Sequence, residues 1–252
     1  MADVVEKPTP RRSVYGSRFM LANLIVVAGF LAVLGLFAYL VSTGSADKGW
    51  SSYKPTGGDV YDKAQNTADH VAPAYKFNGQ PIAVVQAQPL LYQDAAVDGI
   101  GITRQPFRKI GSSIKQFEPA NATIAYVMCG TADKCGLSQV GSEETVPLLR
   151  REALELAMYT FKYSKDVDSV VALLPPEGQT NGAIYLKRKN LADELSKPLG
   201  ETLPPHQVLS YGGMTEVERA RVMRLTGEHL YNSRFVQGPN GRTLLVLRSV
   251  GG

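Results

Sequence analysis

The 252-residue sequence has few of the residues that build catalytic and metal centres. It contains two cysteines and three histidines, and His70, His206 and His229 show no metal-ligand spacing. The H-E-x-x-H, G-x-S-x-G and G-x-x-x-x-G-K-[ST] patterns are missing. The sequence therefore predicts no catalytic residue, no metal site and no cofactor. A non-enzymatic role is favoured, although residues distant in the chain can still meet in an enzyme site.

One pattern of catalytic type does occur. Ser112 and Lys115 have the S-x-x-K spacing of penicillin-recognising serine enzymes, in which the lysine helps to deprotonate the serine. The same spacing recurs in residues 45–48 and 51–54, and the companion S-D-N and K-T-G elements are missing. Because three occurrences in one short chain give the pattern little weight, Ser112 is not predicted to be catalytic.

The sequence also lacks a concentrated basic surface. Its net charge is +4, of which the first 18 residues contribute +2 (four basic minus two acidic residues), leaving +2 for the rest. Nucleic-acid-binding domains gather Lys and Arg on one face or along one helix. The basic residues after position 18 are dispersed instead, so no nucleic-acid partner is predicted.

Only one long apolar run is present, over residues 19–41, with Asn23 as its one strongly polar member. A helix of these 23 residues is about 34 Å long, enough to cross a hydrocarbon core of about 30 Å. The run predicts a single transmembrane helix in contact with the lipid bilayer. A cleaved signal peptide is the alternative, but its apolar core is usually about 7–15 residues.

The charge on the two sides of this run predicts its orientation. Residues 42–50 carry one basic and one acidic residue, whereas the preceding segment carries two acidic residues and four basic ones: Lys7, Arg11, Arg12 and Arg18. Basic flanks stay in the cytoplasm, which places the N-terminus inside and the large C-terminal part outside. Within the span, small residues at Ala28, Ala32 and Gly35 form one stripe and are a candidate helix–helix contact.

The two cysteines lie close together. Cys129 and Cys135 have five residues between them, and Gly130 and Gly136 follow them directly. In an oxidising compartment such a pair indicates a disulfide that closes a small loop. A zinc half-site would need two further ligands, and a redox pair usually has C-x-x-C spacing. A structural disulfide is therefore predicted.

Composition divides the chain into four parts. We expect a disordered cytoplasmic tail at 1–18, a transmembrane helix at 19–41, a polar stalk at 42–72 and one extracytoplasmic domain at 73–252. The mixture of signals inside the domain predicts an α+β fold, in which helices pack on a mainly antiparallel sheet.

Hydrophobic periodicity locates the expected elements. Strands are predicted at residues 81–87, 122–129, 168–174, 183–187 and 207–210, and a terminal hairpin around the turn at 238–241. Ser142 is expected to cap a long helix that ends near Tyr163, and Thr215 a second helix that ends near Glu228. In the second helix, the residues predicted to face inward are Val217, Ala220, Val222, Met223 and Leu225, with Glu218, Arg219 and Arg221 outside.

These features favour a single-pass membrane-anchored module that binds a protein partner or an envelope component. A membrane-tethered hydrolase or transferase with a non-local site is one alternative, and a single-pass ligand sensor is another. In the sensor case, an 18-residue tail has no room for an output domain, so signalling would require a cytoplasmic partner.

Overall fold

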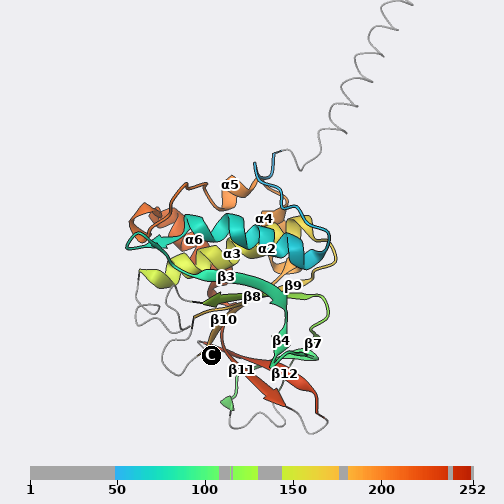
Figure 1. Ribbon diagram of the computed structural model, residues 1–252. Coiled ribbons are helices and arrows are strands. Elements are labelled where there is room, and N and C mark those ends of the chain that lie inside the picture. Colours follow the sequence, from blue (N-terminus) through green and yellow to red (C-terminus); the bar gives the residue numbers. More distant parts are fainter. Residues whose placement is uncertain are drawn as a thin grey trace, which may run out of the picture. The chain divides into compact units, whose positions relative to one another are not determined.

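In the computed structural model, the described residues are 49–107, 114, 116–129, 144–175, 181–237 and 241–250. They belong to a compact unit, Trp50–Gly252, in which helices cover one face of a mixed sheet (Figure 1). The predicted tail and transmembrane helix lie outside the described residues, as do Ala28, Ala32 and Gly35.

The main sheet confirms the predicted α+β class. Its described strands run in the order β3-β8-β9-β10-β11-β12-β6-β7. The pairs β8–β9 and β12–β6 are parallel, and the other neighbouring pairs are antiparallel. The bounds are β3 (Val84–Pro89), β6 (Gly99–Thr103), β7 (Gln116–Pro119), β8 (Thr123–Cys129), β9 (Ser169–Leu173), β10 (Gly182–Lys187), β11 (Leu230–Gln237) and β12 (Thr243–Ser249).

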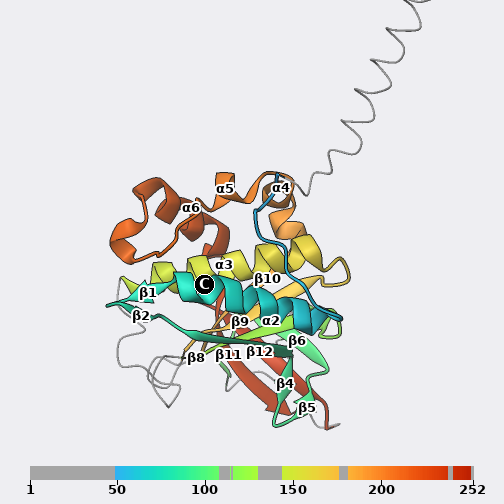
Figure 2. The same ribbon diagram turned by 45° about the horizontal axis from the view of Figure 1, so that its top comes forward.

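Two short ribbons accompany this sheet, formed by β1 (Lys76–Phe77) with β2 (Gln80–Pro81) and by β4 (Leu91–Tyr92) with β5 (Ala95–Ala96). The long helix α3 (Thr145–Tyr163) lies on the sheet and contacts α2 (Val60–Val71) and α6 (Glu216–Gly227) (Figure 2). The shorter helical pieces are η1 (Ala72–Ala74), η3 (Arg188–Leu191), α4 (Ala192–Leu195), α5 (Leu199–Thr202) and η4 (Tyr211–Gly213).

Local capping explains two helix starts. The Asp59 carboxylate accepts hydrogen bonds from the backbone N–H groups of Tyr61 and Asp62 at the start of α2. Thr215 accepts one from the N–H of Glu218 and caps α6 as predicted. The predicted cap of α3, Ser142, lies outside the described residues.

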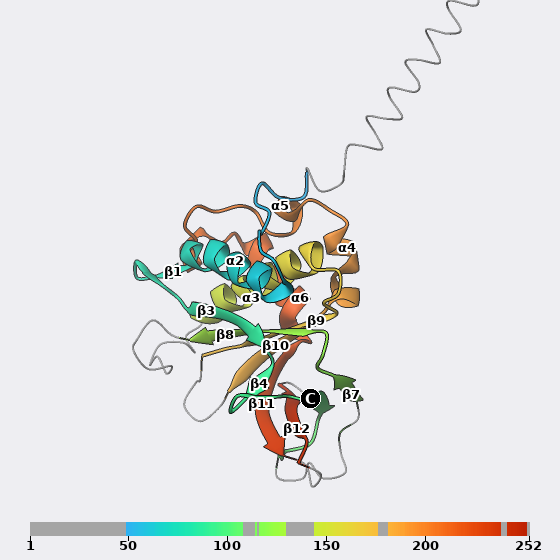
Figure 3. The same ribbon diagram turned by 45° about the vertical axis from the view of Figure 1, so that its right-hand side comes forward.

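The central strands are buried on both faces. In β9, Val170 and Ala172 belong to the core under the helices, whereas Val171 belongs to a second core on the opposite face. This second core also contains Ile100 of β6 and Leu245 of β12, from the far half of the sheet. The sheet therefore curls and covers its own second face (Figure 3).

A hydrogen bond between β10 and β7 shows how far the sheet curls. Four strand spacings separate β10 from β7, about 19 Å in a flat sheet. The hydroxyl of Tyr185 on β10 nevertheless donates to Oε2 of Glu118 on β7 at 2.6 Å. Edge strand β7 thus folds back over the sheet and lies beside β10.

The predicted polar stalk at 42–72 is wrong from Trp50 onward. Trp50 is only 2 % exposed, and Ala64, Ala68 and Val71 of α2 are buried in the same core. The Trp50 ring packs edge-on against Tyr159 of α3, with 5.3 Å between ring centroids. The folded unit therefore begins 23 residues before the predicted boundary at position 73. Most of the buried residues between positions 50 and 72 are small, so the mean hydropathy of this segment is low and the sequence predicted a polar stalk.

Two other expectations need correction. The region around residues 99–103, where no strand was predicted, forms β6, which pairs in parallel with β12. Residues 207–210 do not form a strand within the sheet, because Leu209 makes only an isolated bridge to Tyr75.

Candidate functional site

Helix α6 buries Glu218 and exposes three of the apolar residues that were predicted to face inward. Glu218, expected outside, is 2 % exposed, whereas Val217 and Met223, expected inside, are 69 % and 42 % exposed. Ala220 is exposed with them, and only Val222 and Leu225 are buried as predicted. The predicted orientation of this helix is therefore wrong, and it leaves an apolar surface open.

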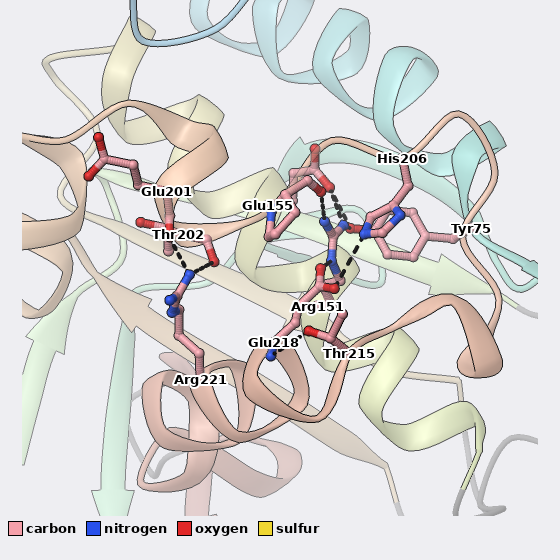
Figure 4. A network of polar contacts seen from close by, with 10 residues as sticks. Tyr75, Arg151, Glu155, Glu201, Thr202, His206, Thr215, Glu218 and Arg221 are labelled. Atoms are coloured by element: carbon pink, nitrogen blue, oxygen red, sulfur yellow. Dashed lines mark hydrogen bonds and ion pairs between the residues drawn. The ribbon is translucent and has the colours of Figure 1, made fainter.

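An ion pair to α3 explains the inverted orientation. Arg151 donates from Nε to Oε1 of Glu218 at 2.6 Å, and both side chains are almost fully buried (Figure 4). A carboxylate is buried at tolerable cost only when a charged or hydrogen-bonding partner meets it. Arg151 supplies that partner from 67 positions away in the sequence, which no local pattern could reveal.

The other donors of Arg151 are also used. Nη1 donates to the Tyr75 hydroxyl and to Oε2 of Glu155, the latter at 2.9 Å, and Nη2 donates to the carbonyl of Pro204 at 2.6 Å. The second oxygen of Glu218 lies 3.3 Å from Nε2 of His206. Figure 4 shows these groups converging between α3 and the loop before α6. The cluster is thus internally satisfied.

The electrostatics of the cluster agree with this interpretation. Burial alone lowers the pKa of Arg151, but the neighbouring Tyr75, Glu155 and Glu218 raise it above its ordinary value. Burial, followed by the charge of Glu155, raises the pKa of Tyr75 far above the usual range. Arg151 therefore stays charged and Tyr75 neutral at physiological pH, which suits a structural clamp better than a proton-transfer site.

Two further arginines also hold α6 by hydrogen bonds. Nη1 of Arg221 donates to the carbonyl of Thr202 at 3.1 Å and to that of Glu201 (Figure 4). Near the end of α6, Nε of Arg150 donates to Oγ1 of Thr226 at 2.8 Å. The orientation of α6 is consequently held by polar groups.

We call Val217, Ala220 and Met223 the α6 outer face. Their i, i+3, i+6 spacing places them on one side of the helix. Arginines border this face: Arg219 lies over the Tyr211 ring at 5.0 Å, and the side chain of Arg224 is 65 % exposed. Single exposed apolar residues are ordinary, whereas a grouped set with a charged rim is typical of interaction sites.

Edge strand β3, by contrast, is protected against pairing. The Gln65 side chain of α2 accepts a hydrogen bond from the N–H of Ala87 at 2.8 Å, and its amide nitrogen lies 3.5 Å from the carbonyl of Val85. Pro89 has no N–H to offer. An unprotected edge would recruit another strand, so this edge is blocked and is not a candidate binding surface.

A polar cleft of about 570 Å³ lies where β7 meets the start of β9 and the end of β10, beside the turn that precedes β8. Glu118 and Lys187 form an ion pair at its wall, and the Glu118 carboxylate also receives the Tyr185 hydroxyl. Behind them, Oγ of Ser169 lies 2.7 Å from Oγ1 of Thr123. Burial, followed by the charge of Lys189, lowers the pKa of Lys187. The cleft is the second candidate site, and its innermost groups also bond to one another.

Only one of the two cysteines of the predicted disulfide is among the described residues. Cys129 ends β8 and is disulfide-bonded, whereas Cys135 lies outside the described residues, so its pairing with Cys129 stays a prediction. Ser112 also lies outside them.

The described part of the chain contains neither a metal-binding cluster nor a membrane-spanning helix. No group of three or more His, Cys, Asp or Glu side chains there is arranged to hold a metal ion. No helix there combines the length and apolarity needed to cross a bilayer, and residues 19–41 lie outside that part.

The functional residues that sequence reasoning missed are those of α6 and the cleft. The cleft combines β7, β9 and β10, whose approach depends on the curl of the whole sheet. Glu218 stands in a charged run with Glu216, Arg219 and Arg221, so no signal in the sequence indicated that it is buried. Comparisons with protein-family models, with curated proteins and with solved structures give no match to this chain.

Proposed function

We propose that this protein is a single-pass, membrane-anchored accessory module whose extracytoplasmic domain binds a protein partner through the α6 outer face. The observation that carries the proposal is the exposure of Val217 and Met223 on a helix that polar contacts hold in place. The apolar run at 19–41 supports the membrane anchor, and the charges before it support the orientation.

The chemistry of this face specifies the partner. An apolar centre flanked by arginines is complementary to an apolar helix or groove with acidic residues at its rim. Arg224 is available for such a rim, because its side chain is largely exposed and, within the described part of the chain, its ion pair is a 3.6 Å contact with Oε1 of Glu194. The partner is therefore a protein with an apolar, acid-rimmed surface.

The polar clusters support binding over catalysis. The Arg151 cluster is buried and internally satisfied, and the groups at the inner wall of the cleft bond to one another. A nucleophile with a free general base beside it, which covalent catalysis requires, does not occur in either cluster.

A site-specific crosslinking experiment tests the proposal. The full-length protein carries a photocrosslinking amino acid at position 217 or at position 84 and is expressed in its native host. The cells are irradiated, and the protein is then purified in mild detergent. Val84 is a matched control, because it is an exposed valine at 53 % on the protected edge strand. We expect one stoichiometric adduct from position 217 and none from position 84.

The contact must also depend on the apolar face. Without any crosslinking, Val217→Asp and Met223→Asp should each abolish co-purification of the partner protein, whereas Val84→Asp should leave it unchanged. Equal crosslinking from both positions, or co-purification that survives both α6 substitutions, would contradict the proposal.

The hydrolase or transferase alternative has one specific observation in its favour, the lowered pKa of Lys187 at the wall of the polar cleft. A lysine accepts a proton only as the neutral amine, and a lowered pKa increases the neutral fraction at physiological pH. If that alternative holds, Lys187→Met should abolish turnover of an envelope substrate, whereas Lys197→Met, outside the lining of the cleft, should not. A ligand sensor would instead require a cytoplasmic protein that crosslinks to the N-terminal tail.

A further inference from the structure

A second hollow, of about 160 Å³, lies at the ends of β9 and β10 opposite to the polar cleft. Apolar side chains from α3, from β11 and from the segments after β9 and β12 form most of its wall: Val146, Leu149, Leu174, Pro175, Leu230 and Val250. Arg150 is the one charged residue among those that line it. We call this hollow the Arg150 pocket.

Arg150 is an exceptional buried cation. It is only 5 % exposed, and its Nη2 atom is buried with no hydrogen-bond partner among the described residues. Its one hydrogen bond within that part of the chain runs from Nε to the uncharged Thr226 hydroxyl. Burial lowers the pKa of Arg150, and no carboxylate of the described residues offsets the effect.

Its surroundings compensate the charge only in part. Nη2 would lie 3.7 Å from a Cβ placed on Gly227, so the guanidinium is beside the C-terminal end of α6. A helix C-terminus provides roughly half a negative charge, which is less than a full counter-ion. Buried charges in proteins are almost always paired, so the missing anion requires an explanation.

We propose that the Arg150 pocket binds a small carboxylic acid with a compact apolar body, whose carboxylate pairs with the Arg150 guanidinium. A guanidinium matches a carboxylate in geometry and charge. The aliphatic wall accepts the apolar body, and a cavity of about 150 Å³ is known to take up benzene. The volume therefore fits a ligand of the size of benzoate or of a short branched fatty acid.

This inference goes beyond the proposed function and does not depend on the α6 outer face. Val217 and Met223 are not among the residues that line the pocket. Loss of partner binding and loss of acid binding can consequently be measured in different variants.

The test uses the full-length protein in detergent micelles and sodium benzoate as the probe, with isothermal titration calorimetry. Benzyl alcohol and benzylamine are the controls, because they keep the ring and replace the carboxylate by a neutral or a cationic group. We expect benzoate to bind at least about tenfold more tightly than either control, since only the carboxylate completes the ion pair.

Two variants separate the charge from the cavity. Arg150→Gln should weaken benzoate binding at least about tenfold and remove the preference over benzyl alcohol. Val146→Phe should fill part of the pocket at a half-buried position and weaken binding while the guanidinium stays. Cooperative unfolding of each variant shows that it is folded, and the wild-type titrations decide the matter alone if Arg150→Gln does not fold.

Three results would overturn the proposal: equal affinity for benzoate and benzyl alcohol, unchanged benzoate binding in a folded Arg150→Gln protein, or no heat of binding at about 10 mM benzoate, where even a weak site is occupied.

Discussion

Helix α3 places three ionisable residues in succession in the interior, and their environments differ sharply. Arg150, Arg151 and Glu152 are 5 %, 3 % and 0 % exposed. Arg151 meets two carboxylates, a tyrosine hydroxyl and a carbonyl. Arg150 reaches one hydroxyl, and neither oxygen of Glu152 has a hydrogen-bond partner among the described residues. All three residues are thus buried, but only Arg151 has oppositely charged partners among the described residues.

Helix geometry explains why the three do not neutralise one another. Residues at i and i+2 point away from each other on a helix, so Glu152 cannot serve as the counter-ion of Arg150. Glu152 instead becomes neutral, because burial and then the charge of Glu155 raise its pKa well above the ordinary carboxyl range. A carboxyl can discard its charge in this way, but a guanidinium cannot. Arg150 therefore keeps a charge that the described residues do not pair.

The largest effect is expected at the compensated arginine. Arg151→Leu leaves Glu218 buried without its ion-pair partner, and such broken pairs typically cost about 3–5 kcal/mol of unfolding free energy. Urea denaturation of the full-length protein measures this change. Arg151→Leu combined with Glu218→Leu should recover part of the loss, because the buried charge of Glu218 is then removed, while Glu155 keeps the hydrogen bond from the Tyr75 hydroxyl. Equal destabilisation in the single and double variants would show that the pair does not set the stability.

The next effect concerns Glu152 and depends on pH. Because the folded state raises its pKa, folding binds a proton, and its contribution to stability is present at acid pH and lost as pH rises. The loss occurs between the pKa of an unfolded glutamate, about 4.3, and the raised value in the folded state. The slope for one proton is at most about 1.4 kcal/mol per pH unit.

Glu152→Gln should therefore gain stability relative to the wild type as pH increases through this window. Urea denaturation at a series of pH values measures the difference, with the exposed Glu228→Gln as the matched control. A difference that is constant with pH would mean that Glu152 carries its charge in the folded protein.

A smaller effect is expected at the uncompensated arginine. Arg150→Met loses the hydrogen bond to Thr226, worth about 1 kcal/mol, and also removes a buried charge that has no carboxylate partner. These terms oppose each other, so the change in unfolding free energy should stay within about 1 kcal/mol. Urea denaturation without added acid provides the measurement. A loss as large as that of Arg151→Leu would show that Arg150 is already paired.

The contrast between the two arginines also shows what the sequence could predict. The terminal hairpin, β8, β9 and β10 followed from alternation and turn residues, and the start of α6 from Thr215. Strand β6 could not be found, because Gly99 pairs with Leu244 near the other end of the chain. The orientation of α6 depends on Arg151, and the early start of the domain depends on Trp50, whose partners Tyr159 and Tyr163 lie far along the sequence. Local patterns identify elements, whereas charges and rings from distant segments decide which sides they bury.

The smallest effect on stability should accompany the largest effect on the proposed interaction. Val217 is exposed and its side chain takes no part in holding α6, so Val217→Asp should change the unfolding free energy by no more than about 0.5 kcal/mol. Its new charge lies between Glu216 and Glu218 in the first turn of α6, where the positive end of the helix dipole favours an acidic residue, and Arg221 follows one turn later. Urea denaturation and co-purification of the same sample measure both quantities. If α6 is held by Arg151 and Arg221 as the contacts indicate, stability stays and the partner is lost; a strongly destabilised Val217→Asp would mean that this side of the helix is packed, and the assignment of inner and outer faces would have to be reversed.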